Sequence, residues 1–85
     1  MSDERIQSAV AQAVSQAYDA WAAEHPTLAS TIDRMTVTDQ VAESLRQSPE
    51  YRQAVIDFGK AQSELAFVSQ LIELATPILI GLVGL

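Results

Sequence analysis

Glu73 is the side chain in this sequence whose surroundings suggest chemistry most directly. It is the only charged residue in the last 21 residues, 65–85, whereas the preceding 64 residues carry the other fifteen charges. An ionisable side chain at membrane depth is a candidate for a proton relay, an ion contact or a salt bridge. The competing interpretation, which we favour, is a neutral or rim carboxylate that hydrogen-bonds across a helix interface together with Gln70. A single carboxylate without a second ionisable group nearby makes a poor relay.

No other set of residues assembles into a catalytic or metal-binding site. The chain has no cysteine and one histidine, His25, which excludes thiolate chemistry and the usual zinc sites. No Ser-His-Asp set, paired-carboxylate site or glycine-rich phosphate loop can be assembled. We therefore predict that the protein is not an enzyme and binds neither metal nor cofactor. A net charge of −6 also disfavours nucleic acid as a partner.

The polar and small residues of the apolar stretch follow a helical spacing. Successive separations of 3, 4, 4 and 3 residues place five of them on one side of a helix, and the rest of the circumference is mostly Leu, Ile and Val. Small residues let two helix backbones approach closely, and polar side chains hydrogen-bond across such a contact. These five residues are the predicted helix-packing seam: Gln70, Glu73, Pro77, Gly81 and Gly84.

The length of the apolar stretch is just sufficient for a membrane span, which needs roughly 20 residues. Its twelve Leu, Ile, Val and Phe residues favour insertion by roughly 4 to 7 kcal/mol, and an ionised Glu73 opposes it by about 3 kcal/mol. Three interpretations of residues 65–85 stay open. The one we favour is a transmembrane anchor; the others are a helix buried in a partner or homo-oligomer, and a helix on the membrane surface. The last lacks the basic polar face that such helices carry.

The first half of the chain predicts amphipathic helices. Residues 3–24 have apolar residues on one helical face, with Ser2 as the cap, and Pro26 ends this helix. A short helix over about 28–35 is predicted next. A capping box at Thr36 to Asp39 then predicts a helix over about 39–47.

The clearest boundary signal is Ser48-Pro49-Glu50, which combines a cap residue, a proline at the first helical position and an acid in the first turn. Nothing between residues 60 and 76 stops the helix that begins here. We therefore predict two regions: an amphipathic helical region over 1–47, and one long helix over 48–85. The 65–85 part of this long helix is the membrane-anchor or buried-oligomer segment.

The predicted fold class is all-α. The sequence indicates a small helical protein with an N-terminal amphipathic helix, a short middle helix or two, and a long C-terminal helix that ends in the apolar segment. Apolar side chains on the faces of the first and the long helix are predicted to meet a partner: Ile6, Val10, Trp21, Tyr51, Val55 and Phe58.

The favoured function is a non-enzymatic, membrane-anchored helical subunit that attaches or scaffolds a larger protein assembly through its C-terminal helix. Two alternatives stay open: a soluble adaptor whose C-terminal helix is buried in a partner or homo-oligomer, and a small pore-forming or membrane-perturbing protein. The expected partners are membrane lipid or an apolar protein surface at 65–85, within a homo-oligomer or a larger complex.

The distribution of basic residues predicts the topology of a membrane-anchored chain. All five precede the apolar stretch, which weakly places the N-terminal part in the cytoplasm. The start, Met-Ser-Asp-Glu-Arg, has no apolar core, so no cleavable signal peptide is expected.

Overall fold

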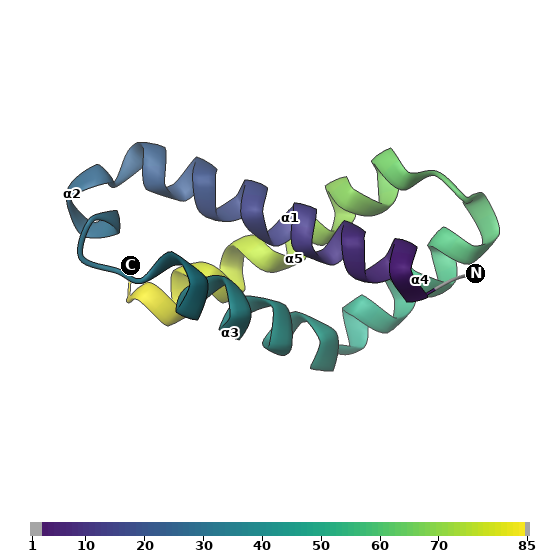
Figure 1. The fold of residues 1–85 in the computed structure, drawn as a ribbon. Helices are drawn as coiled ribbons and strands as arrows, with labels where there is room; N and C mark the ends of the chain where they lie inside the picture. The colour runs from purple at the N-terminus through teal and green to yellow at the C-terminus, as the bar shows by residue number, and fades with distance from the viewer. Residues whose placement is uncertain (1–2, 85) are drawn as a thin grey trace.

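The computed structural model describes residues 3–84, so the predicted cap Ser2 and the last residue, Leu85, lie outside the described residues. Within this range the chain forms helices only, which confirms the all-α prediction, including the long apolar helix at the C-terminal end (Figure 1). The fold is elongated, 41 × 20 × 18 Å. Its helices are α1 (Asp3–Glu24), α2 (Pro26–Ala29), α3 (Arg34–Gln47), α4 (Pro49–Ala61) and α5 (Glu64–Val83).

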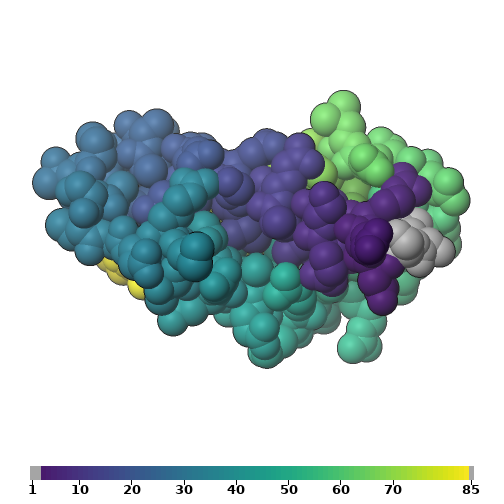
Figure 2. All heavy atoms as spheres, viewed as in Figure 1, coloured from purple at the N-terminus to yellow at the C-terminus, as the bar shows by residue number. Residues whose placement is uncertain are grey.

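Helix α5 is the central element of the fold. Helices α1, α3 and α4 each pack on α5 more extensively than on one another. Figure 2 shows that α1 and α3 hide most of α5 from one side, so that mainly its two ends are visible at the edges of the molecule. The buried core takes residues from four of the five helices: Ala9, Val10, Ala13, Val14, Ala17, Tyr18 and Trp21 from α1, Val41 and Leu45 from α3, Ala54 and Phe58 from α4, and Phe67, Val68, Leu71, Ala75 and Leu79 from α5.

The middle of the chain differs from the prediction. The short helix expected over 28–35 is replaced by α2, which starts at Pro26 and ends at Ala29. The predicted capping box is also wrong, because α3 already begins at Arg34 and includes Thr36 and the residues after it. The Thr38 hydroxyl donates to the Arg34 carbonyl oxygen at 2.8 Å instead. A threonine that bonds back to the preceding turn fits a helix interior, so the helix extends further toward the N-terminus than the sequence pattern indicated.

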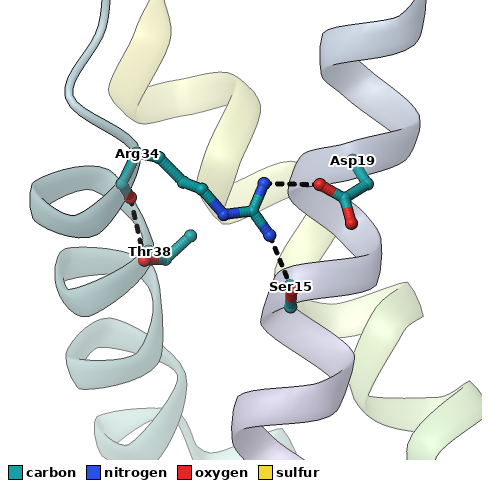
Figure 3. Close-up of polar contacts among 4 residues, drawn as sticks. All are labelled: Ser15, Asp19, Arg34 and Thr38. Carbon is teal, nitrogen blue, oxygen red and sulfur yellow. Dashed lines mark hydrogen bonds and ion pairs between the residues drawn. The ribbon is translucent and has the colours of Figure 1, made fainter.

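Arg34 fixes the start of α3 against α1. Its guanidinium group forms an ion pair with Asp19 and donates to the Ser15 Oγ at 2.7 Å (Figure 3). The same group lies over the Tyr18 ring, 4.8 Å from its centroid. These contacts are exposed to water and each contributes little, but they come from one side chain and set the position of α3 along α1.

The predicted single helix over 48–85 is wrong. Helix α4 ends at Ala61 and α5 begins at Glu64, because Gln62 adopts a left-handed conformation with φ 55°. The Gln62 N–H donates to the Phe58 carbonyl oxygen at 2.7 Å, and the Ser63 side chain caps α5 by accepting from the Ala66 N–H. The left-handed conformation costs a non-glycine residue roughly 1–2 kcal/mol.

Packing across the break offsets this cost. The turn brings Phe58 of α4 and Phe67 of α5 into a stacked pair with ring centroids 4.4 Å apart, and both side chains are buried. Burying an aromatic side chain stabilises a fold by roughly 1.5–3 kcal/mol, and an aromatic pair adds about 0.5–1.5 kcal/mol. A contact between residues on the two sides of the turn, rather than a local stop signal, therefore ends α4.

Replacing Gln62 with Gly is expected to raise the free energy of unfolding by about 1 kcal/mol, because glycine adopts the left-handed conformation without steric cost. The measurement is the midpoint of urea denaturation. The matched control is Gln53→Gly, in the exposed interior of α4, where glycine is expected to lower the free energy of unfolding by about 1 kcal/mol. If both variants changed the free energy of unfolding in the same direction, this explanation of the break between α4 and α5 would be contradicted.

Candidate functional site

Four of the five predicted seam residues lie in α5, and the fifth, Gly84, is the C-cap residue that follows it. Glu73, Pro77, Gly81 and Gly84 are exposed, and Gln70 is partly buried. The opposite face is covered by α1, α3 and α4, and its side chains at Phe67, Leu71, Ala75 and Leu79 are at most 2% exposed. Within the described chain the outer face of α5 is therefore mostly exposed, whereas its opposite, apolar face packs on α1, α3 and α4.

Helix α5 also has the dimensions of a membrane span. It has 20 residues and is the one helix in residues 3–84 that is long and apolar enough to cross a bilayer. It continues through Pro77 without a break, and the Thr76 hydroxyl donates to the Ile72 carbonyl oxygen at 2.8 Å. Length and composition thus agree with membrane association. Within the fold, 28% of the most apolar part of α5 is buried, so the bundle covers one face of the helix and leaves the rest uncovered.

Three of the six predicted partner-facing residues are core residues instead. Val10, Trp21 and Phe58 are buried, because α1 and α4 turn their apolar faces toward α5. We predicted that these three side chains contact a partner protein. In the structure they pack within the fold, against α5 of the same chain. Sequence spacing identified the apolar faces of these helices, but it did not show that α5 would cover them.

The other three residues, Ile6, Tyr51 and Val55, are partly buried and meet in one place. They lie in a groove of about 580 Å³ between the first turns of α1, the end of α3 and the start of α4. We name this hollow the α1–α4 groove. Its lining residues are Asp3, Ile6, Gln7, Arg46, Gln47, Ser48, Pro49, Tyr51, Arg52, Val55 and Ile56.

Hydrogen bonds hold the walls of the α1–α4 groove. The Ser48 hydroxyl oxygen accepts from the Tyr51 N–H at 3.1 Å and so starts α4 at the predicted boundary. Arg46 of α3 donates from its Nε to the Gln7 Oε1 of α1 at 2.9 Å. Burial raises the pKa of the Tyr51 phenol above its usual value, although the nearby Arg46 charge opposes this shift. The phenol is therefore a neutral, amphipathic group at neutral pH.

Arg46 and Arg52 were not identified from the sequence. The pattern that could have found Arg52 is its separation of four residues from Ile56, which puts the two side chains on the same face of a helix. Ile56 is 46% exposed and lines the groove together with Arg52. Arg46 belongs to another helix, and its place in the groove depends on how α3 and α4 meet.

His25 has a structural environment. Its ring stacks on Trp21 with centroids 5.4 Å apart, and its Nδ1–H donates to the Trp21 carbonyl oxygen at 3.1 Å. In residues 3–84 no group of three or more His, Cys, Asp or Glu side chains gathers closely enough to hold a metal ion.

No protein-family model, curated protein or solved structure matches this chain.

Proposed function

We propose that this chain is a non-enzymatic helical adaptor subunit that covers one face of its apolar helix α5 with its own helices and binds a partner through its outer surface. The observation that carries the proposal is the burial of Phe67, Leu71 and Leu79 against α1, α3 and α4. These side chains would face lipid in a spanning helix. Withdrawing α5 into lipid would leave the buried apolar side chains of α1, α3 and α4 in water, at roughly 1.5–3 kcal/mol for each large one, so opening the bundle has a large cost.

A second candidate is the membrane-anchored subunit, and the length and apolar composition of α5 favour it. Three large apolar side chains of this helix are uncovered: Leu65 at 80%, Ile80 at 37% and Leu82 at 45% exposure. In this candidate the bundle opens, α5 inserts, and its seam meets another helix. The third hypothesis, a pore with Gln70, Glu73 and Thr76 as a wet face, predicts dye leakage from liposomes, and intact liposomes would exclude it.

Alkaline-carbonate extraction of membranes from cells that express the full chain tests the adaptor against the anchor. The adaptor is expected in the soluble and carbonate-released fractions. A matched Glu73→Leu variant sharpens the test, since Glu73 is exposed and its replacement leaves the core intact. In a spanning helix this change removes an insertion cost of about 3 kcal/mol and increases the pelleted fraction. A wild-type chain that stays in the carbonate pellet would contradict the adaptor and support the anchor.

A further inference from the structure

We propose that the α1–α4 groove is the docking site for an amphipathic helix of a partner protein, one that carries an acidic side chain beside its apolar stripe. This inference rests on the proposed function, because an adaptor has to offer a docking surface while its bundle is closed. The groove, at about 580 Å³, is larger than four other hollows of the described chain, which measure about 180 to 310 Å³.

The origin of the hollow lies in the packing of the fold. Helices α1 and α4 both pack on α5 and contact each other little. Their adjoining edges therefore leave Ile6, Tyr51 and Val55 only partly buried, with the exposed Ile56 beside them. These side chains form an apolar strip that no other helix of the described chain covers. An amphipathic helix fills such a strip with apolar residues spaced one turn apart.

The charge of the groove selects the partner. The protein carries a net charge of −6, yet the groove has two arginines, Arg46 and Arg52, and one acid, Asp3, in its lining. No ion pair within residues 3–84 involves Arg52, and the Nη1 of Arg46 lies 3.9 Å from the Glu43 carboxylate, at the limit of an ion pair. A guanidinium group binds a carboxylate through two parallel hydrogen bonds. Asp3 and Glu43 lie close enough to offset part of this charge, so Arg52 is the arginine that stays available to an acidic partner. At physiological salt the Debye length is about 8 Å, so charges farther away than this have little effect on the groove.

The composition and size of the groove fit a protein helix. Tyrosine and arginine are the residue types that dominate binding energy in protein interfaces, and both line this groove. Along α4 the lining runs from Pro49 to Ile56, about 10.5 Å at 1.5 Å per residue, which matches about two turns of a bound helix. A contact of this size is typical of weak, reversible association.

Nuclear magnetic resonance titration of the isotope-labelled full chain with two synthetic peptides tests the proposal. Both peptides are amphipathic helices with the same leucine stripe; one carries Glu at its flanking positions and the other carries Lys. The acidic peptide is expected to bind at least tenfold more tightly than the basic one. Its shifts are expected at the amides of Ile6, Gln7 and Arg46 and along α4 from Tyr51 to Ile56.

Two charge reversals on the same helix provide the matched variants. Arg52→Glu is expected to weaken binding of the acidic peptide by at least tenfold, because it replaces an attraction with a repulsion inside the groove. Lys60→Glu changes the net charge equally, but Lys60 is exposed and lies outside the groove, so less than a twofold change is expected. Circular dichroism of both variants verifies that the fold is kept.

Several outcomes overturn the inference. Equal or tighter binding of the basic peptide, or shifts confined to the outer face of α5, would remove the acidic helix as the partner. Groove shifts that depend on protein concentration without peptide would identify a second copy as the occupant. Shifts caused only by vesicles of anionic lipid would identify a membrane surface. A soluble chain that binds neither peptide at millimolar concentration would contradict the docking site but not the adaptor function. A chain that stays in solution only with lipid would contradict the adaptor function itself.

Discussion

A chain that ends at Gln62 is expected to lose its cooperative unfolding transition. Without α5, the core loses Phe67, Leu71 and Leu79, and α1, α3 and α4 lose the helix on which each packs most extensively. A domain of this size has a total stability of about 4–13 kcal/mol, which cannot survive the removal of its central helix. Only weak residual helix is expected in single segments, since helices this short are only marginally stable in isolation.

Far-UV circular dichroism during urea and thermal denaturation measures this effect. The truncated chain is expected to show a weak, gradual change, and the full chain a sigmoidal one. A sigmoidal transition in the truncated chain would show that residues 3–61 fold by themselves. That result would contradict the central role of α5 and would favour its use as a separate anchor.

Replacing Phe67 with Ala is expected to lower the free energy of unfolding by about 3–5 kcal/mol. The Phe67 side chain is 2% exposed, and its ring stacks on that of Phe58 across the break between α4 and α5. The change leaves a cavity and also removes the contact that offsets the left-handed conformation of Gln62. For a domain of this size, each kcal/mol shifts the thermal midpoint by about 4–8 °C, so the expected decrease exceeds 10 °C.

Leu65→Ala is the matched control, because Leu65 lies two residues away on the same helix and is 80% exposed. Its effect on the free energy of unfolding is expected to stay within about 0.5 kcal/mol. Similar losses in both variants would mean that the outer face of α5 is covered in solution. Such a result would indicate self-association through this face.

The elements with local signals could be predicted from the sequence. Helix α1 has an apolar face at helical spacing, and α4 starts at the predicted Ser48-Pro49 boundary. The break after Ala61 could not be predicted, because Gln62 is not a residue type that normally adopts the left-handed conformation. The contact that stabilises the break joins Phe58 of α4 and Phe67 of α5. A contact between two helices can be recognised only when the positions of both helices are known.

The candidate surfaces could also be predicted only in part from the sequence. Spacing alone puts Glu73, Pro77 and Gly81 on one face of a helix, and all three are exposed in α5. Spacing does not say which face the rest of the chain covers, and so it assigned Val10, Trp21 and Phe58 to a partner instead of to α5. The α1–α4 groove combines residues from three helices that all depend on α5 for their positions. No pattern within one helix contains that information.

The two-residue connection between α4 and α5, Gln62 and Ser63, has a consequence for how two copies of this chain interact. If Gln62 took an ordinary helical conformation, α4 and α5 would join into one rod, the form that local sequence favours. The rod would carry α5 out of its own bundle, and the same core contacts could then be made only with α1, α3 and α4 of a second copy. This is a domain-swapped dimer, in which the same buried contacts form between two chains instead of within one. The left-handed residue at 62 thus determines whether α5 folds back within its own chain or is exchanged.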